Sequence, residues 1–100
     1  MKKIITFLTF LSLFLTAGNL FAQTNTWDGS SSVSWSVADN WSLGHVPTST
    51  EDVVIPSAPT NQPIISGITA VCQNLTVNTG ASLEIDPTTL NNASLIASGN

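Results

Sequence analysis

Basic side chains are almost missing from this sequence. Lys2 and Lys3 are the two in the chain, so residues 4–100 hold neither lysine nor arginine, while six acidic residues follow them. A surface without cations cannot neutralise phosphate groups, which excludes nucleic acid as a partner. Attraction to anionic lipid is excluded for the same reason, so we expect no membrane contact once the N-terminal segment is removed.

Cysteine and strong helix formers are also scarce. Cys72 is the single cysteine, so no disulfide can form within the chain and stability must come from packing. We predict that Cys72 is a small buried hydrophobic residue in a strand. Beyond residue 22, serine, threonine and asparagine dominate, and no segment repeats its apolar residues every 3.6 positions. These patterns predict an all-β protein.

The N-terminus has the three parts of a secretory signal peptide. Lys2 and Lys3 precede an apolar run over residues 4–15, and small residues follow near Ala17 and Ala22. We predict cleavage after Ala22, with a cut after Ala17 as the second choice. An uncleaved membrane anchor is the alternative, but the apolar run is shorter than the ~20 residues that span a bilayer. The predicted location is secreted or outer cell surface.

The rest of the chain divides into two regions that differ in amino-acid composition. Residues 23–57 contain all three tryptophans and are predicted as a Trp-rich cap with short strands. Within this cap, residues 32–37 alternate polar and apolar side chains, which predicts a half-buried strand, and residues 52–55 predict another. Asp28 and Gly29 form a strong turn dipeptide between strands.

Residues 58–100 consist of short apolar alternations separated by Asn- and Gly-containing turns, which suits the first coils of a β-solenoid. Strands are predicted at residues 64–65, 68–72, 75–77, 83–85 and 93–97. In a solenoid, Val77, Ile85 and similar residues would stack into a narrow apolar column. A small β-sandwich is the alternative fold.

A longer pattern resembles a known class of proteins. Its shared pieces are Trp27-Asp28-Gly29, the Asn40-Trp41 pair, Gly44, Val46-Pro47-Thr48 and the segment 52–56, followed by residues 72–83. Together they resemble the N-terminal region of secreted, adhesin-like surface proteins of the Bacteroidetes, which are type IX secretion cargo. The resemblance implies the start of a right-handed parallel β-helix. It implies no catalytic residues.

Proteins of that class are much longer and end in a sorting domain. Two incomplete solenoid coils would leave an open apolar end, because coils bury their faces on their neighbours. We therefore expect the chain to be truncated.

The tryptophans are the first candidate binding residues. Exposed rings of Trp27, Trp35 and Trp41 could stack on sugars, whereas buried rings would shield the first coil from water. We favour burial, with carbohydrate binding as the alternative.

Acidic pairs are the candidates for a metal. Glu84 and Asp86 lie two positions apart and so share a strand face, and Glu51-Asp52 is a second pair. Weak calcium binding is the one cofactor that this pattern allows, although no EF-hand spacing supplies the six to eight oxygens that calcium prefers. His45 has no second histidine or neighbouring cysteine and is interpreted as structural or incidental.

The sequence therefore favours an exported structural or adhesive β-solenoid segment with no catalytic activity of its own. Glycans or other surface proteins are the expected partners. Two alternatives remain: a carbohydrate-binding module that uses the tryptophans, and the N-terminal part of a polysaccharide-degrading enzyme.

Overall fold

The computed structural model describes residues 23–88 and 93–99 and shows short strands with almost no helix. This confirms the all-β prediction. The predicted signal peptide and its cleavage sites lie outside the described residues. The strands are β1 (Thr24–Thr26), β2 (Asp52–Ile55), β3 (Ile64–Ile65), β4 (Thr69–Cys72), β5 (Leu75–Val77), β6 (Glu84–Ile85) and β7 (Ser94–Ala97).

One short 3₁₀ helix, η1 (Ala38–Asn40), is the single helical element of the described part of the chain. Within residues 23–88 and 93–99, no helix has the length and apolar character that crossing a bilayer requires.

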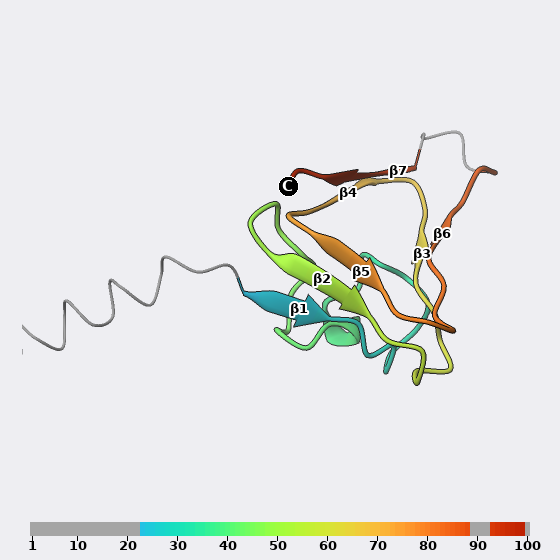
Figure 1. Ribbon diagram of the computed structural model, residues 1–100. Coiled ribbons are helices and arrows are strands. Elements are labelled where there is room, and N and C mark those ends of the chain that lie inside the picture. The colour runs from blue at the N-terminus through green and yellow to red at the C-terminus, as the bar shows by residue number, and fades with distance from the viewer. Residues whose placement is uncertain (1–22, 89–92, 100) are drawn as a thin grey trace, which may run out of the picture.

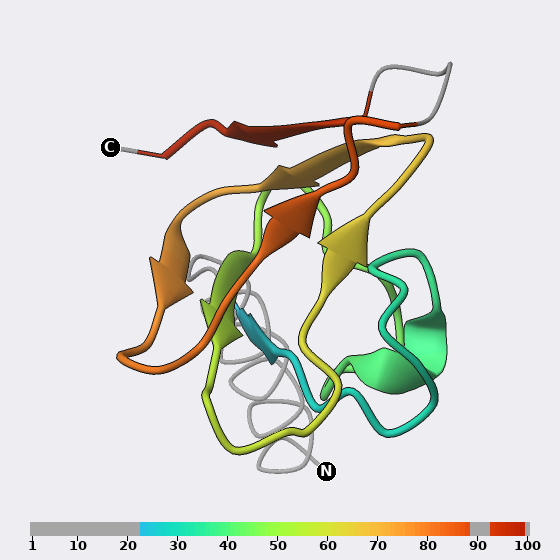
Figure 2. The same ribbon diagram turned by 90° about the vertical axis from the view of Figure 1, so that its right-hand side faces the viewer.

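All strand pairs in the described residues are parallel. β1, β2 and β5 form one three-stranded sheet, while β3 pairs with β6 and β4 pairs with β7 (Figure 1). Strands β2, β3 and β4 therefore form a first level, and β5, β6 and β7 repeat it in the same order as a second level. Figure 2 shows the two levels following similar paths around a common centre.

The pairing places apolar residues of the two levels in register. Ile55 is opposite Val77, and Ile65 is opposite Ile85. Directly paired residues of neighbouring strands project from the same face of a sheet, so these side chains stack. The other apolar pairs in register are Val53 with Leu75, Ala70 with Leu95, Val71 with Ile96, and Cys72 with Ala97.

Burial differs sharply between the two levels. Ile55 and Ile65 are fully buried, whereas Val77 and Ile85 each remain 42% exposed. The expectation that Val77 and Ile85 lie inside an apolar column is therefore only partly right. They stand over buried partners, but no strand of the described chain covers their other side.

The two predicted regions share one core. The buried cluster joins the three tryptophans to aliphatic residues of β2 and β3 and to Cys72 of β4. β2, which the sequence placed in the Trp-rich cap, is also the middle strand between β1 and β5. The cap and the first level are thus packed as one body.

The predicted strand at residues 32–37 is wrong. Ser34 makes an isolated parallel bridge to Ile64, and Trp35 and Ser36 form a turn shortly before η1. Serine hydroxyls accept hydrogen bonds from the amides two residues ahead, at Ser34 and Ser36, and so stabilise local turns in place of a ladder. Trp35 is buried while Val33 is 40% exposed, which contradicts the shared face that alternation predicted.

Candidate functional site

The three tryptophans form a packed cluster beneath the first level. Trp27 and Trp41 meet edge to face with ring centroids 5.1 Å apart, and Trp35 and Trp41 do so at 4.7 Å. Trp27 Nε1 donates to the carbonyl of Asn61 at 2.7 Å, and Trp41 Nε1 donates to that of Trp35 at 2.8 Å. Among the described residues, Trp35 Nε1 has no hydrogen-bond partner.

These contacts remove the basis of the carbohydrate-binding alternative. Trp27 and Trp35 are fully buried and Trp41 is 2% exposed, so their ring faces cannot stack on a sugar. The physical reason is that this small chain has few other bulky groups, and burying an aromatic side chain contributes more to its core than display on the surface. The structure thus agrees with the buried arrangement.

Asn40 organises the loop that carries Trp35. Its side-chain oxygen accepts hydrogen bonds from the amides of Ser31 and Ser32 at 2.8 and 2.9 Å. Its amide nitrogen donates to the carbonyl of Ser34 at 2.9 Å and to the hydroxyl of Ser32 at 3.1 Å. A fully buried amide is stable there because both ends of the group are paired.

A second polar cluster surrounds Glu51, which is only 7% exposed. Oε1 accepts hydrogen bonds at 3.2 Å from Asn25 Nδ2 and from the amide of Thr48. Oε2 lies 2.5 Å from Nε2 of His45. Because an ionised carboxylate can only accept, His45 Nε2 is the donor whenever Glu51 is charged. We name these residues, Asn25, His45, Thr48 and Glu51, the Glu51 cluster.

The Glu51 cluster lowers the pKa of Glu51. Burial by itself would raise that pKa, since it disfavours the charged carboxylate. The hydrogen bonds from His45, from the Thr48 amide and from Asn25, with the charge of His45, outweigh burial and hold the pKa below its ordinary value. Glu51 therefore stays ionised inside the protein.

The Glu51 cluster holds a loop against two strands. Asn25 on β1 also donates to the carbonyl of His45 at 2.9 Å and accepts from the amide of Leu43 at 3.2 Å. The cluster therefore ties the loop over residues 43–48 to β1 and to the start of β2. Within the described residues, the contact of the His45 ring is the one with Glu51.

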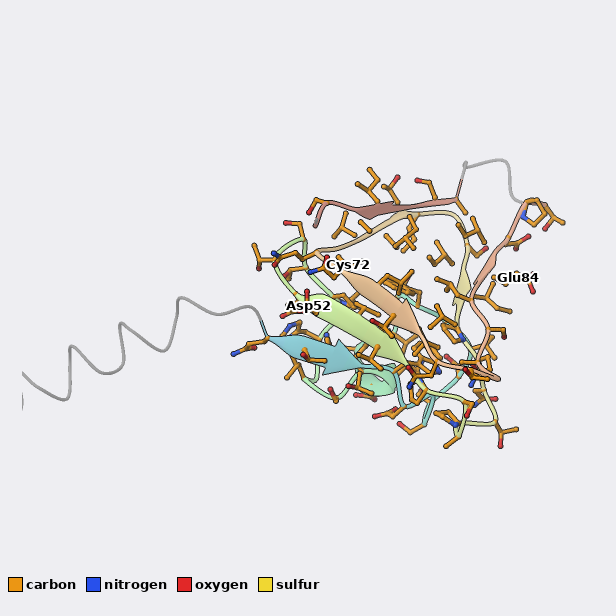
Figure 3. All side chains as sticks on the ribbon, viewed as in Figure 1. Asp52, Cys72 and Glu84 are labelled. Atoms are coloured by element: carbon orange, nitrogen blue, oxygen red, sulfur yellow. The ribbon has the colours of Figure 1, made fainter. Side chains whose placement is uncertain are left out.

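Cys72 is buried and free, as predicted. Burial raises the pKa of its thiol, and the charge of nearby Asp52 raises it further. The thiol is thus held in its protonated, unreactive form. Figure 3 shows Cys72 close to Asp52, on the opposite side of the molecule from Glu84.

Glu84 and Asp86 have different surroundings in the described part of the chain. Glu84 is exposed and points outward (Figure 3). Asp86 instead accepts hydrogen bonds from the amide and hydroxyl of Thr88, which lower the pKa of its carboxyl, with a smaller effect from Ser66. Within the described residues, no group of three histidine, cysteine or acidic side chains could hold a metal ion.

Sequence reasoning missed the Glu51 cluster and the role of Asn40. The sequence indicates Glu51 only as half of an acidic pair, and it indicates the asparagines only as turn residues. Glu51 and His45 lie six positions apart in a loop, and Asn25 is far from both, so no sequence spacing indicates their contact. The one available signal was that the single histidine lies close to an acidic residue.

Parallel strands in small sheets, packed on a cluster of three tryptophans, define this protein as a small all-β module. The chain belongs to a family described as a domain of unknown function, DUF8693, whose model matches residues 26–97. The match begins in β1 and ends in β7, so it spans the cap and both levels. Comparison with curated proteins and with solved structures gives no match.

Proposed function

We propose that this chain is an exported structural or adhesive segment that begins a right-handed parallel β-solenoid and has no catalytic activity of its own. The observation that carries the proposal is the repeat of strand order and register. β5, β6 and β7 pair in parallel with β2, β3 and β4, and their inward residues stack on those below. Parallel pairing without hairpins is the pattern of a solenoid and not of the β-sandwich alternative, whose strands pair antiparallel.

The cap has a clear part in this proposal. A solenoid needs its first coil shielded from water, and the buried tryptophans lie against the first level. β1 pairs with the outer edge of β2, and Ser34 bridges to Ile64 of β3. These contacts protect strand edges that would otherwise recruit other chains.

The chemistry of the chain supports a role outside the cell. Its N-terminal residues match a signal peptide, and the remainder has acidic and hydroxyl side chains but no lysine or arginine. Glycans or other surface proteins suit such a neutral-to-acidic polar surface as partners.

The fold can be tested by nuclear magnetic resonance on the purified protein from Gln23 onward. We expect contacts between the backbone protons of Val54 and Thr76, in the pattern of parallel neighbours. Short distances between α-protons across these strands would instead indicate antiparallel pairing. That outcome would remove the solenoid and the function built on it.

Export and adhesion need a separate test. We expect the full chain, expressed in a Gram-negative bacterium, to leave the cytoplasm and begin at Gln23 by intact mass. A product that keeps Lys2 and Lys3 and stays in the cytoplasm would contradict export. Binding of the processed protein to arrays of glycans and of surface proteins would then test adhesion, and release of reducing sugar from a polysaccharide would contradict the non-catalytic role.

A further inference from the structure

The loop over residues 43–48, here called the 43–48 loop, contacts two buried polar side chains, Asn25 and Glu51. The amide of Leu43 donates to Asn25 Oδ1 at 3.2 Å, and the carbonyl of His45 accepts from Asn25 Nδ2 at 2.9 Å. Nε2 of the same histidine lies 2.5 Å from the Glu51 carboxylate. Asn25 is fully buried and Glu51 is 7% exposed, although most residues of the loop are exposed. The loop therefore takes part in burying two polar groups.

The Glu51 carboxylate is the common partner of these contacts. Its Oε1 accepts hydrogen bonds at 3.2 Å from the Thr48 amide and from Asn25 Nδ2, and its charged Oε2 accepts from His45 Nε2. Hydrogen bonds to an ionised carboxylate are about twice as strong as those between neutral groups. A proton on this carboxyl would also face groups that donate. Protonation of Glu51 therefore weakens all three contacts at once.

Few other contacts oppose release of the 43–48 loop. Val46 is half-buried against the core and Pro47 is buried, whereas the remaining residues of the loop are exposed. A Cβ at Gly44 would find no heavy atom within 4 Å apart from its chain neighbours, so the space beside it is open. Among the strand pairs and bridges of the described chain, none includes a residue of this loop. The loop thus depends on its polar contacts more than the strands do.

We propose that the 43–48 loop is an acid-operated flap, which opens as a unit when Glu51 takes up a proton while the parallel strand pairs stay formed. Opening would bring the side chain of Asn25, buried in the closed form, to the surface beside β1. The strand pairs persist because they are joined by backbone groups, which do not titrate. The flap is independent of the proposed solenoid, since it requires only the contacts of the Glu51 cluster.

His45 is the charged group that acts on the Glu51 carboxylate. Asp52, the next residue along β2, accepts a hydrogen bond from Asn74 Nδ2 at 3.0 Å in an exposed position. Cys72 of β4 is kept in its neutral thiol form by its raised pKa, and β1 contributes no charged side chain. The state of the flap is therefore decided by the Glu51–His45 pair.

The sign of the pH dependence follows from the closed form. Burial raises the pKa of Glu51, but the hydrogen bonds and the charge of His45 outweigh burial and hold this pKa below its ordinary value. In the open flap the carboxyl regains its ordinary pKa. Between the ordinary and the lowered value, each unit fall in pH therefore shifts the equilibrium towards the open form by up to about tenfold. Above the ordinary value the flap stays closed.

Amide hydrogen exchange of the protein from Gln23 onward, measured by nuclear magnetic resonance at a series of acidic pH values, tests the flap. Protection is expressed relative to an unstructured peptide at the same pH. The Leu43 amide is the reporter, because it donates to Asn25 and not to Glu51 itself, and the Val53 amide within the sheet is the reference. We expect Leu43 protection to fall by up to about tenfold per pH unit, with Val53 at least about tenfold more protected throughout.

Three variants identify the titrating group. Glu51→Gln keeps the size of the side chain and removes the titration, so Leu43 protection should no longer depend on pH in this range. His45→Gln keeps the carboxylate without its charged partner, which should lower Leu43 protection at neutral pH and reduce its fall in acid. Glu84→Gln is the matched control at an exposed position and should behave as the natural protein does.

Three results would overturn the flap. The first is constant protection of Leu43 while the carboxyl carbon of Glu51 titrates. The second is equal protection of Leu43 and Val53 that falls together, since acid would then unfold the whole molecule. The third is an undiminished fall in both Glu51→Gln and His45→Gln, which would assign the acid effect to other carboxyl groups. The proposed function depends instead on the parallel pairing of β2 with β5, so each idea can fail alone.

Discussion

At the scale of single residues, buried polar side chains position much of the cap. Asn25 and Asn40 are fully buried, and each uses its amide oxygen and its amide nitrogen in hydrogen bonds to loop atoms. Their short side chains hold segments that have too few apolar residues to pack by themselves. Glu51 likewise holds loop atoms by hydrogen bonds, and its carboxylate is charged.

Glu51→Gln is expected to destabilise the protein at neutral pH by about 1–3 kcal/mol, because the hydrogen bonds to its charged carboxylate are lost or weakened. The pKa of Glu51 is lower in the folded protein than its ordinary value. Its stabilising effect is therefore complete above the ordinary glutamate pKa and is lost as pH falls through the folded value. The variant should show a flatter decline of stability in acid.

Urea unfolding at several pH values, followed by circular dichroism, measures this effect. Glu84→Gln is the matched control because Glu84 is exposed, and a change below about 0.5 kcal/mol is expected there. If the free energy of unfolding of Glu51→Gln falls with acid as steeply as that of the natural protein, the charged Glu51 cluster does not stabilise the fold.

Asn40→Ala removes a buried group with four hydrogen bonds. Several backbone and hydroxyl partners in the Ser31–Ser34 turn would be left unpaired, so we expect a loss of about 2 kcal/mol or more in the free energy of unfolding. Asp39→Asn tests the neighbouring exposed position, where its backbone carbonyl still accepts from Ser30. A similar loss for both variants would contradict the special role of Asn40.

At the scale of elements, glycine corners connect the strands. Gly29 has a φ of +60°, and a Cβ there would lie 2.5 Å from the carbonyl oxygen of Asn61 and 2.9 Å from Trp27 Nε1. Those two atoms form the hydrogen bond that joins the tryptophan cluster to the loop before β3. Gly44 has a φ of +76° but open space around it.

The pair Gly29→Ala and Gly44→Ala separates backbone strain from steric conflict. Gly44→Ala should cost about 1–2 kcal/mol through its left-handed backbone alone. Gly29→Ala should cost at least about 2 kcal/mol more, because the new methyl also displaces the Trp27–Asn61 contact. Urea unfolding of both variants measures the difference. Equal losses would show that the close contact of Gly29 with Asn61 and Trp27 does not contribute to stability.

Sequence reasoning worked best for the strands of the two levels. β2, β3 and β5 lie where apolar alternation placed them, and β4, β6 and β7 differ by one residue at an end. It failed at residues 32–37, since alternating serine and apolar residues look like a strand even when the hydroxyls stabilise turns. The cap is built by contacts between distant residues, such as Trp27 with Asn61, which no local pattern encodes.

At the scale of the whole molecule, the acidic side chains have almost no basic side chains to balance their negative charge. Beyond residue 22 the chain carries six acidic side chains, and His45 is the single basic side chain there. Apart from the contact between His45 and Glu51, these charges repel one another in the folded protein.

Added sodium chloride is therefore expected to stabilise the protein. Raising it from about 10 mM to about 200 mM shortens the screening length to less than 10 Å and weakens the repulsion, for a gain of up to about 1 kcal/mol. The urea midpoint at pH 7 measures the gain, which should shrink as the pH is lowered and carboxylates become protonated. A midpoint that falls with salt would show that attractive pairs dominate instead.

The position of the tryptophan cluster also determines which unfolding events intrinsic fluorescence can detect. Beyond residue 22, Trp27, Trp35 and Trp41 are the only aromatic side chains of the phenylalanine, tyrosine and tryptophan types, and all three belong to the buried core, outside β6 and β7. Intrinsic fluorescence is consequently blind to fraying of β6 and β7, whereas far-ultraviolet dichroism records it. A difference between the melting temperatures from fluorescence and from circular dichroism would show that β6 and β7 unfold separately from the tryptophan cluster.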